Sequence, residues 1–182
     1  MTPSKIYPIT LIALGAAILA VFSPLALPFG PVPITLQTLA VGIVASLLRP
    51  REAFLSILVY LLLGGVGLPV FSAGGSGFGV LFGPTGGFLL AFLPVGLLMS
   101  LVLTRYQHKP WLSFLINLLG FALILLIGSF WFKTYNHASW QSAFELAFLP
   151  FVPIELLKAV VSSIVSLSLL PILRRSQPYF TN

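Results

Sequence analysis

FVPIELLKAVVSSIVSLSLLPIL, residues 151–173, is a long apolar run that contains two charged residues. A helix that crosses a bilayer needs roughly 20 mostly apolar residues, and this run is long enough. It also contains Glu155 and Lys158, which lie three positions apart and therefore on one face of a helix. A charged residue at the centre of a membrane helix costs about 2.5–3.5 kcal/mol or more, so such residues usually have a function. The run predicts a membrane helix with a functional polar position.

The charged pair lies near the start of this predicted helix. Pro153 is suited to a first helical turn, and the helix dipole favours the negative charge of Glu155 there. Lys158 lies one turn deeper. The pair could contact a ligand, or it could be an internal salt bridge that fixes helix packing. A buried ion pair seldom adds stability over apolar packing, which favours the ligand interpretation.

The composition points to a bilayer around the whole molecule. The chain has 182 residues, of which 58% are hydrophobic and 7% charged, whereas soluble domains carry about 25% charged residues. The net charge of +6 comes from short basic clusters between apolar runs, so no nucleic acid partner is expected. Cysteine is absent, which excludes disulfides and thiolate metal sites.

Apolar runs bounded by charges and prolines predict six membrane spans. They cover about residues 9–27, 34–48, 53–67, 84–103, 111–132 and 151–173. No domain boundary or internal repeat is visible. We therefore predict an all-α integral membrane protein in which residues 1–182 form a single bundle of six transmembrane helices.

The basic residues predict the orientation of the bundle. If the six spans alternate, one side of the membrane carries Lys5, Arg49, Arg51, Arg105, Lys109, Arg174 and Arg175. The other side carries Lys133 alone. Cytoplasmic loops are enriched in Lys and Arg, so both termini are predicted to be cytoplasmic.

The predicted outer connections, residues 28–33, 68–83 and 133–149, are rich in Gly, Pro and aromatic residues. The aromatic residues are Phe71, Phe78, Phe82, Trp140, Phe144 and Phe148. Irregular backbone at membrane depth is tolerated only where it is buried in protein or lines a cavity. These segments are therefore predicted to form a lid or pocket wall. Alternatively, their aromatic residues only anchor the protein at the membrane interface.

Two further segments carry candidate ligand contacts. Residues 64–77, GGVGLPVFSAGGSG, contain too much glycine for a regular helix over their second half, and glycine lets the backbone approach a ligand closely. The same glycines could instead serve a tight turn with close helix packing. In the segment 31–38, PVPITLQT, Gln37 and Thr38 are polar at membrane depth. They either hydrogen-bond across helices or face a pocket.

Small residues mark one more surface, on the first span. Ala13 with Ala17, and Ala16 with Ala20, are spaced four apart and let another helix come close. That helix could belong to this chain or to a partner.

Three segments in order give the chain a resemblance to a known family. They are PVPITLQT (31–38), LLGGVGLPVFSAGGSGFGVLFGPTGG (62–87) and PFVPIELLK (150–158). With them, the chain resembles the BioY family, the biotin-specific S components of energy-coupling factor transporters. The resemblance implies a six-helix bundle with a biotin pocket near the outer face, roofed by the outer loops.

The resemblance also implies functional residues and partners. Glu155 and Lys158 would contact biotin, although the family more often has Asp at the position of Glu155, and Ser72 or Ser76 would replace an amide found in some members. The full set of candidate ligand-binding residues is Glu155, Lys158, Ser76, Phe71, Ser72, Gln37 and Thr85. Ala13, Ala17 and Ala20 would dock onto a transmembrane coupling subunit that works with two ATPase subunits, in a bacterial cytoplasmic membrane.

Two other functions were weighed. An intramembrane enzyme would need a nucleophile with a base, or a metal site, yet His108 and His137 fall on opposite sides of the predicted membrane and no HExxH motif exists. A small-solute channel would need rings of polar residues along a span, and one charged pair near the end of a single span does not supply them. We therefore expect a binding protein that is not an enzyme, with biotin as the transported ligand and no metal or cofactor.

Overall fold

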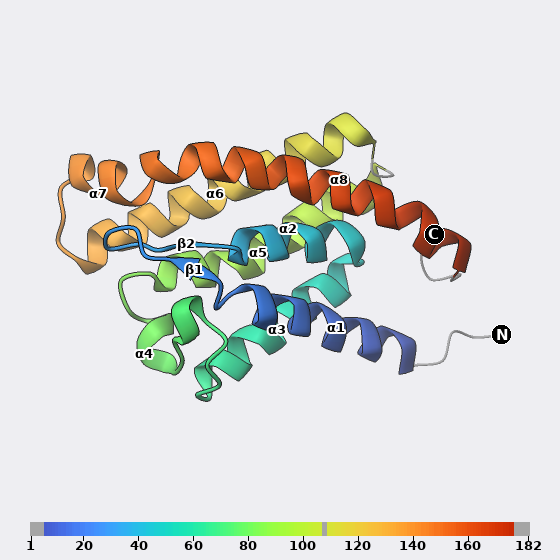
Figure 1. Ribbon diagram of the computed structural model, residues 1–182, viewed down its shortest axis with the longest axis horizontal. Coiled ribbons are helices and arrows are strands. Elements are labelled where there is room, and N and C mark those ends of the chain that lie inside the picture. Colours follow the sequence, from blue (N-terminus) through green and yellow to red (C-terminus); the bar gives the residue numbers. More distant parts are fainter. Residues whose placement is uncertain (1–5, 107–108, 177–182) are drawn as a thin grey trace.

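In the computed structural model, which describes residues 6–106 and 109–176, long helices lie side by side along one axis (Figure 1). Their bounds are α1 (Ile6–Phe22), α2 (Gln37–Leu47), α3 (Pro50–Gly65), α5 (Gly86–Arg105), α6 (Pro110–Tyr135) and α8 (Val152–Ser176). Shorter elements join them: α4 (Phe78–Leu81), α7 (Trp140–Ala147) and the 3-10 turns η1 (Ser72–Gly74) and η2 (Leu149–Phe151). The fold is therefore mostly helical, as predicted.

One small sheet corrects the all-α prediction. Strand β1 (Ala26–Leu27) pairs antiparallel with β2 (Ile34–Thr35). The first helix ends at Phe22, five residues before the predicted end of its run, because the residue before Pro24 is disfavoured in the α conformation. The second helix begins at Gln37 and not at 34, because Pro31 and Pro33 hold the preceding chain extended.

Three helical segments of the described chain are long and apolar enough to cross a membrane: Gly86–Arg105, Pro110–Tyr135 and Trp140–Leu173. Helices α1 and α2 are apolar but shorter. Residues 133–149 were predicted to be a connection without a helix. In the structure, α6 continues to Tyr135 and α7 occupies Trp140–Ala147. Ser139 caps α7 by accepting a hydrogen bond from the Ser142 backbone N–H at 3.1 Å.

Helix α8 is polar on its inner face and apolar on its outer face. Its buried face carries Glu155, Lys158, Ser162 and Ser166, while large apolar side chains are exposed on the other side. The exposed apolar residues include Leu156, Leu157, Val160, Val161 and Ile164. This inversion of the usual soluble pattern is what a helix surrounded by lipid requires.

Helix α2 forms the centre of the bundle. Every residue from Gln37 to Ser46 is buried, which is the pattern of a helix enclosed on all sides. Deep in the bundle, Asn117 of α6 donates to the Ser46 hydroxyl at 3.2 Å and accepts from Ser162 of α8 at 2.9 Å. Polar side chains thus link α2, α6 and α8 inside the bundle by hydrogen bonds across helices.

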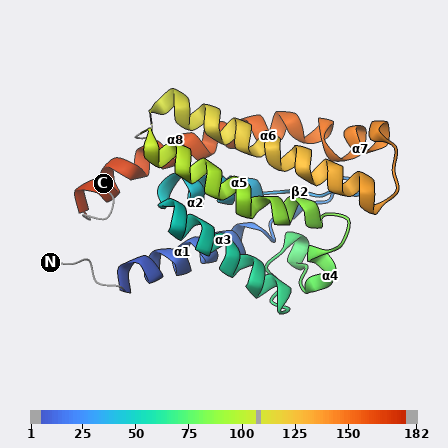
Figure 2. The same cartoon turned by 180° about the vertical axis from the view of Figure 1, so that it is seen from behind.

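The two ends of the bundle differ in character. The start of α1, the end of α8 and the turn between α2 and α3 lie at one end (Figures 1 and 2). The strands, α4 and α7 lie at the other. Arg49 and Arg51 flank that turn; Lys5 and His108, which also entered the sequence analysis, lie outside the described residues.

The glycine-rich segment after α3 is irregular, as its composition predicts. Gly67, Gly74 and Gly77 have positive φ angles, as does Ala73 at 53°. The Gly77 N–H donates to the Gly64 carbonyl at 2.7 Å and folds the segment back against the end of α3. The segment therefore returns to the bundle as a defined loop.

Candidate functional site

The most polar buried group of the described chain joins α2 to the start of α8. Lys158 Nζ lies 2.6 Å from Glu155 Oε1. The Thr38 hydroxyl donates to the same oxygen at 2.9 Å and accepts from Lys158 Nζ at 2.9 Å. Only 4% of Glu155 and 6% of Lys158 is exposed. Two opposite charges are therefore held in the interior by one hydroxyl from another helix.

Two buried polar atoms of the residues around this site have no hydrogen-bond partner among the described residues. Glu155 Oε2 accepts no hydrogen bond from any described residue, and the Ser72 hydroxyl forms no hydrogen bond with any described residue. A buried polar atom without a partner costs roughly 1–3 kcal/mol, and more when it is charged. Such atoms call for a ligand or water to satisfy them.

Polar side chains at the start of α2 form hydrogen bonds with one another and with α3. The Thr35 hydroxyl accepts from the Gln37 backbone N–H at 3.3 Å, which satisfies a free donor of the first helical turn. Gln37 Nε2 donates to the Tyr60 hydroxyl of α3 at 3.1 Å. Of the two interpretations left open for Gln37 and Thr38, both apply, because each residue bonds across helices and also lines a cavity.

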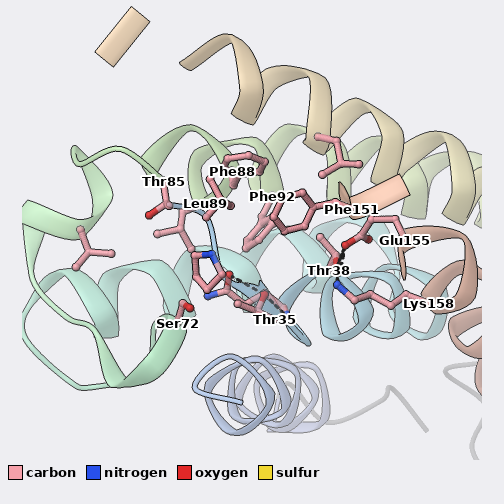
Figure 3. A pocket seen from close by; sticks show the side chains of 15 residues that line it. Thr35, Thr38, Ser72, Thr85, Phe88, Leu89, Phe92, Phe151, Glu155 and Lys158 are labelled. Atoms are coloured by element: carbon pink, nitrogen blue, oxygen red, sulfur yellow. Dashed lines mark hydrogen bonds and ion pairs between the residues drawn. The ribbon is translucent and has the colours of Figure 1, made fainter. Parts of the chain in front are cut away.

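That cavity is partly open, and about 550 Å³ of space lies between its walls when the open solvent at its mouth is counted. Figure 3 shows Thr38, Glu155 and Lys158 at one end, Ser72 and Thr85 toward the other, and aromatic side chains between them. Its lining residues are Val32, Pro33, Thr35, Gln37, Thr38, Ser72, Val80, Thr85, Phe88, Leu89, Phe92, Leu125, Phe151, Glu155 and Lys158. Mostly apolar walls with a few placed polar groups are typical of ligand sites.

Two of the three segments predicted to form a lid or pocket wall do line the cavity, residues 28–33 through Val32 and Pro33 and residues 68–83 through Ser72 and Val80, whereas no residue of 133–149 belongs to its lining. Trp131 Nε1 of α6 donates to the Gly83 carbonyl at 2.9 Å and so holds the turn that presents Thr85. The aromatic residues of these segments divide between two roles, because Phe78 and Trp140 are exposed while Phe71 is fully buried.

Five of the seven predicted ligand contacts line the cavity: Glu155, Lys158, Ser72, Gln37 and Thr85. Phe71 and Ser76 do not belong to its lining. The Phe71 ring packs edge-on to Tyr60, with centroids 5.6 Å apart, and lies directly over Gly64. Phe71 therefore anchors the loop that presents Ser72, because only a glycine leaves room for its ring.

The aromatic part of the cavity was not predicted from the sequence. Phe88, Phe92 and Phe151 line it, together with Thr35. Phe88 and Phe92 are four residues apart and therefore share a helical face, a signal that could have been used. Phe151 precedes the charged pair by one helical turn, in the 3-10 turn η2.

The alanines of α1 fall into two groups, one exposed and one packed against the rest of the bundle. Ala13 and Ala17 are exposed on the outside of the bundle, whereas Ala16 is buried and Ala20 packs partly against the core. No described residue covers the face formed by Ala13 and Ala17, and Ala20 does not belong to the same exposed face.

The described residues contain no group of three or more His, Asp or Glu side chains that could hold a metal ion. His137 is exposed in the turn between α6 and α7. What the cavity can do chemically is bind: it offers a carboxylate acceptor, an ammonium donor and hydroxyls around an aromatic interior.

Comparison with known proteins assigns the family. The model of the BioY family matches residues 1–175. The chain belongs to the BioY family. Within it, Biotin transporter BioY2 of Lactococcus lactis subsp. cremoris is 53% identical over 182 residues, covering all of both chains. Probable biotin transporter BioY of Bacillus subtilis is 40% identical over 167 residues, which cover 91% of this chain and 89% of that protein.

A solved structure shares the BioY-family fold seen here. The crystal structure of the S-component for biotin from an ECF-type ABC transporter superposes with a TM-score of 0.83 at 25% sequence identity. The match covers 99% of this chain and 98% of that one. The helical arrangement around the cavity is therefore that of a transporter S-component.

Proposed function

We propose that this protein binds biotin in the cavity between α2, α5 and α8, as the substrate-binding subunit of a membrane uptake transporter. The observation that carries the proposal is the buried Thr38–Glu155–Lys158 group, with an unpartnered carboxylate oxygen, at one end of a mostly apolar cavity. The names of the relatives and of the matching crystal structure support the choice of ligand.

Biotin suits the chemistry of this cavity. Its ureido group has two N–H donors and a carbonyl acceptor, its fused ring is apolar, and its tail ends in a carboxylate. A carboxylate accepts N–H groups, and an ammonium donates to carbonyl or carboxylate oxygens. Glu155, Lys158 and Gln37 would hold one polar end, while Ser72 and Thr85 would lie near the other. Phe88, Phe92 and Phe151 would cover the rings.

The orientation in the membrane is part of the proposal. Six spans, formed by α1, α2, α3, α5, α6 and α8, would place both termini and the basic turn at Arg49 and Arg51 in the cytoplasm of a bacterial cell. The cavity would then open near the outer face. The positions of the strands, α4 and α7 at the end opposite the basic turn support this orientation (Figure 1).

Delivery of biotin to the cytoplasm requires a driving partner. A transmembrane coupling subunit with two ATPase subunits would supply it, and the exposed pair Ala13 and Ala17 on α1 is the proposed docking face. Small residues let a partner helix approach closely in a membrane. The protein itself performs no covalent chemistry and is not an enzyme.

A binding titration tests the proposal. The purified protein in detergent, free of ligand, is titrated with biotin and with a panel of other water-soluble vitamins by isothermal titration calorimetry. We expect saturable binding of one biotin per chain, no comparable binding of the other vitamins, and recovery of unchanged biotin afterwards. Equal binding across the panel, or no binding of biotin to folded protein, would reject the proposed function.

A further inference from the structure

Thr38 has a hydroxyl that its own helix leaves unused. In the described helices, the hydroxyls of Ser56, Ser163 and Ser166 donate to carbonyls four residues earlier. Thr38 is the second residue of α2, so the residue four positions before it is Ile34, which belongs to β2. Its hydroxyl therefore has no helical carbonyl to bond to, and it reaches α8 instead.

The contact breaks the symmetry of the Glu155 carboxylate. Oε1 accepts from both Thr38 and Lys158, at 2.9 and 2.6 Å, while Oε2 is buried and accepts from no described residue. The terminal torsion of a glutamate is broad and roughly two-fold, so the side chain alone does not distinguish its two oxygens. The donors on Oε1 leave Oε2 as the free acceptor.

Lys158 cannot fix this arrangement by itself. It lies on the same helix as Glu155, three residues away, so the pair can turn together relative to the rest of the cavity. Thr38 lies 117 residues away in sequence, on α2, beside Gln37. This contact ties the charged pair of α8 to α2 at the end of the cavity where all three side chains lie (Figure 3).

From these contacts we infer that Thr38 is a positioning residue for ligand binding: its hydroxyl orients Glu155 so that Oε2 is presented to a ligand N–H donor. The inference rests on the proposed function, because it needs a ligand that occupies this cavity. Thr38 acts through Glu155 and Lys158, since its single proton is used by Oε1 and its oxygen accepts from Nζ.

The test compares two replacements of Thr38. Thr38→Ser keeps the hydroxyl, and Thr38→Val replaces it with a methyl group of similar size. Hydrogen bonds to charged groups are worth more than neutral ones, so Thr38→Val should raise the dissociation constant for biotin by about 10- to 100-fold. Thr38→Ser should stay within about threefold of the wild type, since a hydroxyl at the same position restores the bond.

A matched control separates positioning from stability. Ser46→Ala removes another buried hydroxyl of α2, one that bonds to Asn117 and does not line the cavity. We expect Ser46→Ala to lower the melting temperature of the ligand-free protein while leaving the dissociation constant within about twofold. If Thr38→Val does not yield folded protein, Thr38→Ala provides the same readout with a smaller side chain.

A double variant asks whether Thr38 acts through the carboxylate. In a Glu155→Met background, Thr38→Val should change biotin affinity by less than threefold, because methionine leaves no side-chain oxygen for Thr38 to orient. The inference is overturned if Thr38→Val binds like the wild type, if Thr38→Ser loses affinity as Thr38→Val does, or if the effect persists in full in Glu155→Met. If the wild type itself fails to bind biotin, the proposed function falls with it, so the two failures are distinguishable.

Discussion

Removing one charge of the buried pair should cost stability, and removing both should cost almost none. In Lys158→Met, the Glu155 carboxylate keeps Thr38 as a donor but loses the ammonium at 2.6 Å, in a site where only 4% of Glu155 is exposed. Breaking a buried ion pair in this way costs about 3–5 kcal/mol. In Glu155→Gln/Lys158→Met, no charge is left unpaired, and the free energy of unfolding should return to within about 1 kcal/mol of the wild type.

Ligand binding should not recover in the double variant. If both charged groups bond to biotin, with charged hydrogen bonds worth about 1.5–3 kcal/mol each, Lys158→Met should lose about 10- to 150-fold in affinity and the double variant at least about 100-fold. That loss corresponds to about 2.8 kcal/mol. These results would mean that the pair is retained for binding, because it adds almost nothing to the free energy of unfolding.

Two measurements on the same preparations decide this. Unfolding of the ligand-free protein by denaturant, in one fixed detergent, gives stability through the fluorescence of the chain's tryptophans. Calorimetric titration with biotin gives affinity. Glu145→Gln is the control, because Glu145 is exposed on α7 and its only described partner is Gln141; it should change neither quantity. The reasoning is refuted if the double variant is as unstable as Lys158→Met, or if it binds biotin like the wild type.

Three more changes probe the packing, the loop and the outer face of α1. A Cβ at Gly42 would lie 2.6 Å from buried side-chain atoms of α6 and α8, so Gly42→Ala should lower the free energy of unfolding by about 1–3 kcal/mol, measured by denaturant titration. Ser72→Ala should weaken biotin binding by about 3- to 10-fold, since its hydroxyl is buried at the cavity without a partner, while Ser76→Ala should leave the titration unchanged. Ala13→Leu/Ala17→Leu should preserve biotin binding in detergent and reduce uptake of labelled biotin by cells.

Each of these changes can fail in a specific way. Gly79→Ala is the control for Gly42, because a Cβ at Gly79 meets open space, and equal stability of the two variants would contradict the packing argument. Equal effects of the two serine variants would contradict the placement of Ser72 at the cavity. Val21→Leu is the control on α1, where Val21 is exposed; normal uptake by the alanine variant would exclude that face as a docking surface.

Local patterns were sufficient to predict the helices near Glu155 and the irregular loop after α3. Long hydrophobic runs predict membrane helices, because a segment that crosses a bilayer must be apolar and must satisfy its backbone hydrogen bonds within itself. Both properties can be recognised in the sequence of the segment alone. Positive φ angles at Gly67 and Gly74 follow from glycine's lack of a Cβ. The strands β1 and β2 were not predicted, because each has only two residues and their pairing depends on the turn between them.

The site was predicted in part, and the misses share a cause. Glu155 and Lys158 stand out because a charge in an apolar run is costly wherever the run folds. Phe71 was assigned to the ligand because it lies in the loop, yet its ring turns to Gly64 and Tyr60. A loop sequence does not say which of its side chains faces the cavity and which anchors the loop.

Hydropathy and helical spacing are local properties, so they were enough to predict a membrane protein with two opposite charges on one face of its last long helix. Only the tertiary structure decided what those charges meet. The bond between Thr38 and Glu155 joins residues 117 positions apart, and the unpartnered Oε2 exists only because α2 and α8 pack as they do. Such contacts depend on how helices pack across the bundle, and that information is not contained in any one segment.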